Sequence, residues 1–255
     1  MIDTLDTERV EALQRLFLEP SGWLRSQAEQ APVRADGAPL PWFTYGAIEF
    51  LRRVVRSSDS VFEFGAGHST LWWQAHVQRV CSVEHDLQWC DRLRPRLRSN
   101  AQLHAVGLGH PASAEAQARV APFFARRRRT AWPYDAQRVV RRGLADEPFV
   151  AYAHRIAEAG GPFDFVVVDG MARRLCTWLA IEQVKPDGFI VLDNSNRSDY
   201  DLAFTRLAEA GFRQLPFWGL VPGADFMTCT SFFTRSIERL PTAAFGGNGF
   251  GLPEY

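Results

Sequence analysis

Apolar residues follow one another along this chain in two alternating patterns, short continuous runs and longer segments with helical spacing. The short runs predict strands that are buried on both faces of a parallel sheet; they cover residues 60–64, 79–84, 102–106, 163–168 and 189–192. Segments with apolar positions three or four residues apart predict helices; they cover residues 7–18, 44–56, 69–77, 87–98, 171–184 and 199–210. This alternation predicts an α/β fold with a doubly wound, mostly parallel sheet.

Two further strands are expected at residues 212–218 and 226–234, where the alternation is less regular. They bring the sheet to seven strands, with a late strand that runs antiparallel to the others. We place the main domain at residues 42–240. Residues 1–41 are expected to form an N-terminal helical extension, and the glycine-rich residues 241–255 are expected to form an extended tail.

Residues 107–148 interrupt the alternation and are too long for an ordinary connection between a strand and a helix. They contain four consecutive arginines at 126–129, followed by Trp132 and Tyr134. We expect a partly helical insertion beside the functional cleft. Its arginines could hold a phosphate, a carboxylate or an acidic glycan; the alternative is a solvated helix face.

The amino-acid composition narrows the classes of molecule that the protein is expected to bind. The 29 basic and 29 acidic residues give no net charge, which argues against a broad attraction to nucleic acid or to anionic membranes. Cys81, Cys176 and Cys229 lie in apolar surroundings and form no CxxC pair, so they predict buried free thiols rather than a zinc site. The chain shows no signal peptide and no run of 18 apolar residues. We therefore expect a soluble cytoplasmic protein.

The strongest local motif is Glu63-Phe64-Gly65-Ala66-Gly67-His68-Ser69-Thr70, which ends a predicted strand and opens a helix. Glycines in this place let the backbone turn sharply and approach a ligand, and the positive end of the helix dipole then faces that ligand. The third glycine of the dinucleotide fingerprint is missing because Thr70 replaces it, which disfavours a bound pyrophosphate. The alternative is a tight turn without a ligand.

A second motif, Val83-Glu84-His85, ends the second predicted strand. An acidic side chain in this place can accept hydrogen bonds from both hydroxyls of a ribose. Glu84 lies 17 residues after Gly67, which is about the spacing that a strand-helix-strand unit needs. The alternative is a solvated glutamate at a strand end.

Together with later motifs, these segments resemble the class I S-adenosylmethionine-dependent methyltransferases over roughly residues 42–235. The later motifs are the strand-end segment Phe163–Gly170, the turn and strand Lys185–Asn194, and the late strand around Thr228–Phe233. The resemblance implies S-adenosylmethionine as the cofactor. It also implies a set of cofactor-binding residues, namely Glu63, Gly65, Gly67, Ser69, Glu84 and Asp169.

Within that class, Asp169, Asp193 and Asn194 resemble the metal ligands of cation-dependent O-methyltransferases. All three supply oxygen ligands from neighbouring strand ends, which suits Mg²⁺, and Mg²⁺ could lower the pKa of a substrate hydroxyl. The alternative is that Asp169 contacts the cofactor while Asp193 and Asn194 cap the next turn.

The sequence departs from that pattern at the position of the catalytic base. Metal-dependent catechol enzymes carry a lysine shortly after the first aspartate, whereas Met171-Ala172-Arg173-Arg174 follows here, and arginine is not deprotonated in proteins. The candidate catalytic residues are therefore Asp169, His68 and His85.

These observations predict a methyltransferase that acts on a hydroxyl of a small molecule or sugar. The expected partners are that small-molecule or glycan acceptor and a second copy of the chain in a homodimer, without nucleic acid or membrane. Three alternatives stay open. They are an RNA methyltransferase that uses the arginine-rich insertion, an NAD-dependent oxidoreductase on a similar fold, and a binding module without catalysis.

Overall fold

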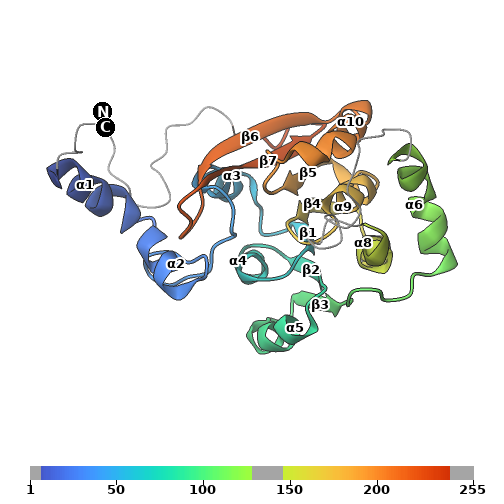
Figure 1. The fold of residues 1–255 in the computed structure, drawn as a ribbon, viewed down its shortest axis with the longest axis horizontal. Helices are drawn as coiled ribbons and strands as arrows, with labels where there is room; N and C mark the ends of the chain where they lie inside the picture. The colour runs from blue at the N-terminus through green and yellow to red at the C-terminus, as the bar shows by residue number, and fades with distance from the viewer. Residues whose placement is uncertain (1–6, 128–145, 242–255) are drawn as a thin grey trace.

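The predicted strands assemble into one seven-stranded sheet in the computed structural model, which describes residues 7–127 and 146–241 (Figure 1). The strand order is β3-β2-β1-β4-β5-β7-β6. The strands are β1 (Ser60–Phe64), β2 (Arg79–Glu84), β3 (Ala101–Ala105), β4 (Phe163–Val168), β5 (Val184–Leu192), β6 (Arg213–Leu220) and β7 (Met227–Thr234). Because β7 pairs antiparallel with both β5 and β6, it runs against the other six. The predicted fold class, including its late antiparallel strand, is confirmed.

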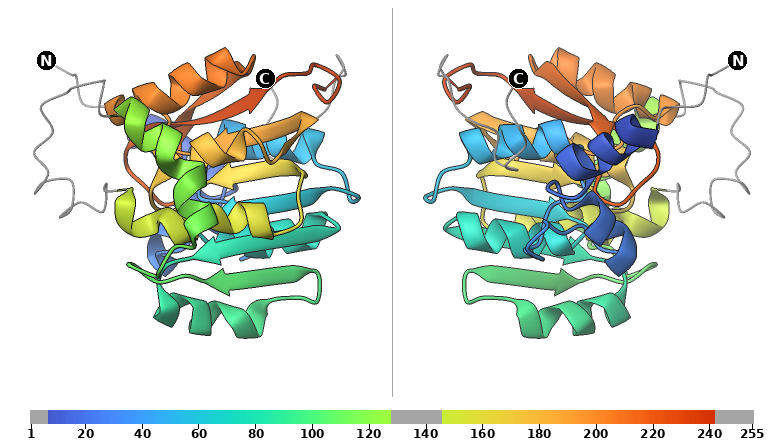
Figure 2. Two further views of the ribbon diagram at one scale, coloured as in Figure 1. Left: turned by 90° about the vertical axis from the view of Figure 1, so that its right-hand side faces the viewer. Right: turned by 90° about the vertical axis from the view of Figure 1, so that its left-hand side faces the viewer.

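Helices cover both faces of this sheet (Figure 2). One layer holds α3 (Tyr45–Val54), α4 (His68–His76) and α5 (Leu87–Leu93). The other layer holds α6 (Ala114–Arg127), α8 (Val150–Glu158), α9 (Arg173–Ala180) and α10 (Asp201–Glu209). At the N-terminus, α1 (Thr7–Leu13) continues as a π-helical turn (Gln14–Leu18), and α2 (Trp23–Glu29) follows. None of the helices in the described ranges is long and apolar enough to cross a bilayer.

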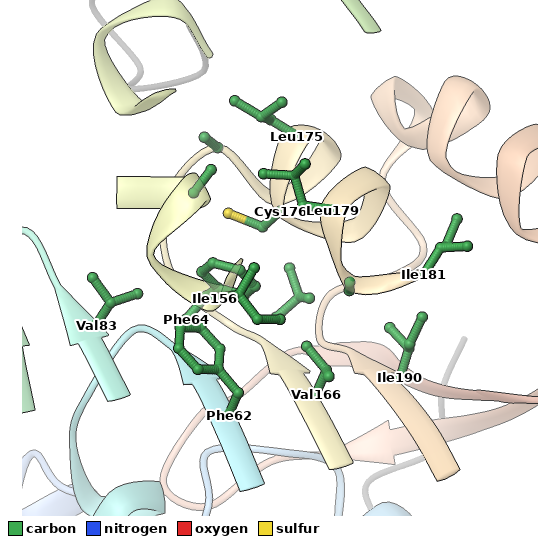
Figure 3. Packing of buried hydrophobic residues seen from close by; sticks show 14 of the residues in the cluster. Phe62, Phe64, Val83, Ile156, Val166, Leu175, Cys176, Leu179, Ile181 and Ile190 are labelled. Atoms are coloured by element: carbon green, nitrogen blue, oxygen red, sulfur yellow. The ribbon is translucent and has the colours of Figure 1, made fainter. Parts of the chain in front are cut away.

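The strands are apolar on both faces because each face is buried under a helical layer. In β1, Phe62 and Phe64 face the core beneath α8 and α9, whereas Val61 faces the core beneath α3 and α4. Figure 3 shows Phe62 and Phe64 pointing toward the helices that carry Ile156 and Leu179. All four cysteines are buried and free, as expected for the three predicted thiols.

Two helices and one strand boundary differ from the sequence predictions. The short α2 and α8 were not predicted, although the buried residues Val150, Ala153 and Ile156 of α8 recur at helical spacing. The expected turn at 186–188 lies instead inside β5, which already begins at Val184. An irregular register between Phe163 and Phe165 accommodates this early start, and a Cβ on Gly188 would lie only 2.7 Å from the Asp164 carbonyl oxygen.

The described part of the insertion belongs to a helical layer. Ala116, Val120 and Phe123 of α6 are buried in the core that α8 and α9 share, and Arg126 donates to Glu209 of α10 at 2.8 Å. The first arginine of the cluster is therefore paired within the protein. Residues 128–145, which include Trp132 and Tyr134, and the predicted tail from residue 242 lie outside the described residues.

A buried ion cluster joins the chain after β7 to the amino ends of the central strands. The Arg239 guanidinium lies 2.6 Å from Asp59 and 3.1 Å from Asp164, and it covers the Phe165 ring at 5.0 Å. Lys185 lies 2.8 Å from the other oxygen of Asp164. Arg239 is 4% exposed, so both aspartates depend on it for charge compensation.

We expect Arg239→Ala to lower the free energy of unfolding by about 3–5 kcal/mol, because it leaves Asp59 and Asp164 buried with too little compensating charge. The matched variant Lys185→Ala should cost about 1 kcal/mol or less, because the Lys185 side chain is 37% exposed. Urea unfolding of both variants measures the difference. Equal losses would contradict the assignment of Arg239 as the central cation.

Candidate cofactor site

The carboxyl ends of four parallel strands bring the predicted site residues to one edge of the sheet. β1 runs into the turn at 65–67, β2 ends at Glu84, and Asp169 and Asp193 directly follow β4 and β5. These strands are neighbours in the order β2-β1-β4-β5. Ligand sites in doubly wound sheets form at this edge, so the predicted residues lie where a ligand is expected.

Two glycines allow the ends of β1 and β4 to approach each other closely. Gly65 has a φ of +90°, which L side chains rarely adopt, and a Cβ there would lie 2.7 Å from the Gly170 Cα. A Cβ on Gly170 would lie 2.7 Å from the Gly65 nitrogen. The Asp169 N–H donates to the Phe64 carbonyl at 3.0 Å and joins the two turns. Neither glycine position has room for a side chain.

Gly67 differs because the packing of the protein does not require a glycine there. Its φ of −178° is ordinary extended backbone, and the nearest atom to a Cβ would be Trp89 Cζ2 at 4.0 Å. The Trp89 indole donates to the Ala66 carbonyl at 2.7 Å and so lies beside the turn. Space is therefore left open over Gly67, as close approach by a ligand requires. This observation fits the predicted cofactor.

The backbone N–H groups of the turn are already engaged by side chains. The Ala66 N–H donates to Glu84 Oε2 at 3.0 Å, and the Gly67 N–H donates to Thr70 Oγ1 at 3.0 Å. In a dinucleotide site, amides of this turn face the pyrophosphate. Here two of them are not free to do so.

Glu63 supports the turn from inside the protein. Its Oε2 accepts hydrogen bonds from Thr70 Oγ1 at 2.5 Å and Ser82 Oγ at 2.9 Å, and it is fully buried. Burial raises the pKa of Glu63 to about 7, against the hydroxyls of Ser69, Thr70 and Ser82, which lower it. Its Oε1 has no hydrogen-bond partner among the described residues. Glu63 and Ser69 therefore lie behind the predicted turn and brace it.

Glu84 lies beside the turn with one oxygen more heavily engaged than the other. Oε1 accepts the N–H groups of His85 at 2.7 Å and Asp86 at 2.8 Å, and it lies 2.6 Å from His85 Nδ1. Among the described residues, Oε2 accepts one hydrogen bond, from the Ala66 N–H. Although burial acts against ionisation, these hydrogen bonds together lower the pKa of Glu84. A carboxylate oxygen can accept about two hydrogen bonds, so Oε2 can still accept a ligand hydroxyl.

The three predicted metal ligands converge, but the guanidinium of Arg173 lies between them. Arg173 Nη2 lies 2.9 Å from Asp169 Oδ1, and Nη1 lies 3.6 Å from Asp193 Oδ2 and 3.3 Å from Asn194 Oδ1. Arg173 also donates to the backbone carbonyls of Gly170, Asp193 and Asp169 at 3.0, 2.7 and 2.9 Å. A fixed cation thus occupies the expected Mg²⁺ position.

The Mg²⁺ prediction is therefore not supported by the geometry of these residues. The described ranges hold no group of three or more His, Cys, Asp or Glu side chains that could bind a metal ion. Asp193 points instead to the Thr230 hydroxyl, from which it accepts a hydrogen bond at 2.7 Å. Asn194 has a φ of +49° and donates to Thr228 of β7.

The candidate catalytic side chains differ in their exposure and in the direction in which their surroundings shift their pKa values. Burial and the neighbouring Asp193 raise the pKa of Asp169 well above its usual range, against the opposing effect of Arg173. The Asp169 side chain is 20% exposed and that of Asp193 only 4%. The hydrogen bond with Glu84 raises the pKa of His85. Burial and the charge of Arg96 lower the pKa of His68, against the charge of Glu29, which raises it.

Sequence reasoning missed the part that two residues play in building this edge, namely Arg173 and Thr230. Arg173 follows Asp169 by four residues, and this spacing could have suggested an ion pair. Thr230 also accepts the Thr44 N–H at 3.1 Å and so links β7 to the start of α3. The late-strand motif contains Thr230, but its spacing does not show that this residue reaches Asp193, because only the pairing of β7 with β5 brings the two together.

Comparison with known proteins finds solved structures that are similar to this chain. No protein-family model and no curated protein sequence matches the chain. It is similar to precorrin 8w decarboxylase from Methanobacterium thermoautotrophicum, with 13% identity, a TM-score of 0.46, and coverage of 81% of this chain and 97% of that one. It is also similar to a methyltransferase-like protein from Silicibacter pomeroyi DSS-3, with 17% identity, a TM-score of 0.45, and coverage of 77% and 88%.

A third similar structure is the cofactor-bound Rv0187 from MTB, with 16% identity and a TM-score of 0.44. The match covers 92% of this chain and 99% of that one. These likenesses concern the course of the chain, which has the Rossmann-like arrangement that the sequence resemblance predicts. The function is argued below from the residues of the site.

We expect Glu63→Gln to change how stability depends on pH. A carboxyl whose pKa is raised in the folded state stabilises the fold only while it is protonated, so its contribution is lost as pH rises from about 4.5 to about 7. Relative to wild type, the variant should therefore gain up to about 3 kcal/mol between pH 4 and pH 8. Urea unfolding at several pH values measures this gain, and a pH-independent difference would contradict the raised pKa.

Proposed function

We propose that the protein is an S-adenosylmethionine-dependent methyltransferase. The observation that carries the proposal is the turn at 65–67, where Gly67 leaves space for a ligand while the Ala66 and Gly67 amides are held by Glu84 and Thr70. The site thus offers carboxylates rather than free amides to its ligand. A cationic sulfonium nucleoside suits such a site, and an anionic pyrophosphate does not.

The other charged side chains at this edge of the sheet also favour a cationic ligand over an anionic one. Asp169 and Asp193 share a single guanidinium, Arg173, and Glu84 lies beside the turn next to His85. The positive charge of the ligand would therefore meet a surplus of acidic groups, with Glu84 as the acceptor for its ribose hydroxyls. An NAD-dependent oxidoreductase is the less favoured alternative because its two phosphates would face these carboxylates without free turn amides.

The cofactor would supply a methyl group bound to a positively charged sulfur. The residues of the protein position the acceptor and remove its proton while that group moves in line to the acceptor oxygen. We assign the proton-accepting role to Asp169, because it is the more exposed of the two aspartates and Arg173 and Asp193 fix its orientation. His85 is bound to Glu84, so we assign it to holding the ribose acceptor.

The proposed acceptor is a hydroxyl of a small molecule or sugar that binds without a bridging metal ion. Arg173 supports this view, since it fills the position that a bridging cation would need. An RNA acceptor has less support. Among the described arginines of the insertion cluster, Arg126 is paired with Glu209.

We expect isothermal titration to show binding of S-adenosylhomocysteine, the product of the donor, and no binding of NAD. Glu84→Gln should weaken that binding by about 2 kcal/mol, roughly 30-fold, because it removes a charged acceptor of ribose hydroxyls. Asp91→Asn is the matched control, since the Asp91 side chain is 82% exposed and should leave affinity unchanged. Binding of NAD alone would overturn the proposal in favour of an oxidoreductase.

We expect labelled S-adenosylmethionine to transfer its methyl group to a member of a panel of hydroxylated metabolites and glycans, with equal yield in magnesium and in EDTA. Asp169→Asn should lower turnover about 10²- to 10⁴-fold, as expected for loss of a general base, while affinity for S-adenosylhomocysteine changes little. Mass spectrometry of the products measures both effects. Loss of product in EDTA would contradict a metal-independent site.

A further inference from the structure

The peptide group between Ala66 and Gly67 is held by a hydrogen bond at each end. Its carbonyl accepts the indole N–H of Trp89 at 2.7 Å, and its N–H donates to Thr70 Oγ1 at 3.0 Å. Thr70 is fully buried, and its hydroxyl donates in turn to Glu63. The N–H of this peptide is therefore directed into the protein rather than toward a ligand.

Trp89 reaches the Ala66 carbonyl through a closed ring of hydrogen bonds that includes Glu84. The Ala66 N–H donates to Glu84 Oε2, and Glu84 Oε1 accepts the Asp86 N–H. Asp86 caps α5, where its Oδ1 accepts the backbone N–H of Trp89 at 2.9 Å. The indole N–H of Trp89 closes the ring at the Ala66 carbonyl. Glu84, the proposed ribose acceptor, and Trp89 thus hold both backbone polar groups of Ala66.

The half-buried Trp89 ring borders the space that Gly67 leaves open. Its Cζ2 atom is the nearest atom to a Cβ built on Gly67, at 4.0 Å. The Arg92 guanidinium lies over the ring at 5.2–5.4 Å's upper bound, 5.4 Å from the centroid, and such a contact stabilises the ring in its place. The indole is therefore a wall of the ligand space as well as the donor that orients the adjoining peptide.

The orientation of this peptide affects which ligand the turn can bind. Dinucleotide sites present free turn amides to a pyrophosphate, and hydrogen bonds to an anion are stronger than neutral ones. Thr70 stands where the dinucleotide fingerprint has its third glycine, and its hydroxyl takes up the amide of this peptide. A diphosphate would therefore receive no donor from the peptide, whereas a cationic sulfonium needs none.

We propose that Trp89 and Thr70 are specificity-determining residues of the donor site, which clamp the 66–67 peptide and so select a sulfonium nucleoside over a nucleoside diphosphate. This inference rests on the proposed function and adds the residues that set the choice of ligand. Because a peptide group is planar and rigid, either hydrogen bond alone still restricts its rotation. Release of the N–H toward a ligand requires the loss of both.

The test is a titration of Trp89→Phe, Thr70→Ala and the double variant with S-adenosylhomocysteine and with ADP, which share an adenosine. Trp89→Phe should bind S-adenosylhomocysteine about threefold more weakly, and the double variant about tenfold more weakly, as expected for the loss of neutral hydrogen bonds that shape the turn. The double variant should bind ADP about tenfold more tightly than wild type, because the released amide can donate to the diphosphate. A merely structural role would weaken the binding of both ligands together.

Trp42→Phe and Thr70→Ser are the matched controls. Trp42 also donates its indole N–H to a loop carbonyl, that of Pro222 at 2.9 Å, and Thr70→Ser keeps the hydroxyl. Both controls should leave both affinities at the wild-type value. Should Thr70→Ala not fold, Trp89→Phe decides alone, by weaker binding of S-adenosylhomocysteine without weaker binding of ADP.

Three results would overturn the inference. They are unchanged affinity for S-adenosylhomocysteine in Trp89→Phe, parallel weakening of both ligands, and binding of ADP to the folded double variant that is no tighter than to wild type. Failure of the proposed function is separate, since wild type itself would then not bind S-adenosylhomocysteine.

Discussion

The close contact between Gly65 and Gly170 is the constraint on which the candidate site depends. β1 and β4 are neighbours at the centre of the sheet, and their outgoing turns touch because neither glycine carries a side chain. The contact permits the hydrogen bond from Asp169 to Phe64, which places Asp169 beside the turn. A side chain at either position would force the two strand ends apart. The acidic side chains and the turn would then no longer lie together.

The buried carboxyl groups at this edge of the sheet are compensated by hydrogen-bond donors or by a cation. Glu63 is stabilised by hydroxyl donors and Glu84 by backbone amides, while Asp169 and Asp193 share one guanidinium. Burying several carboxyl groups together is costly because like charges repel and each loses hydration. The raised pKa values of Glu63 and Asp169 are the measure of that cost. A ligand that brings positive charge would reduce it, which couples ligand binding to the stability of the edge.

The sequence predicted those parts of the molecule whose cause is local. Strands such as β1 and β4 were found because burial on both faces requires continuous apolar runs, and the turn at 65–67 was found because its glycines follow a strand directly. The start of β5 was wrong, since Gly188 is needed for contact with Asp164 rather than for a turn. The predicted Mg²⁺ site is not supported, for a related reason. Its three oxygen ligands were predicted to converge, but nothing in their spacing shows that Arg173 lies between them.

Replacing a metal ion by Arg173 changes what the edge can do for an acceptor. Mg²⁺ keeps open positions that a substrate hydroxyl can occupy. The Arg173 donors, in contrast, are directed to three backbone carbonyls and to the side chains of Asp169 and Asn194. The guanidinium therefore fixes the geometry of the aspartates without offering a place for substrate oxygen. In the proposed reaction, orientation of the acceptor would therefore depend on side chains other than Arg173.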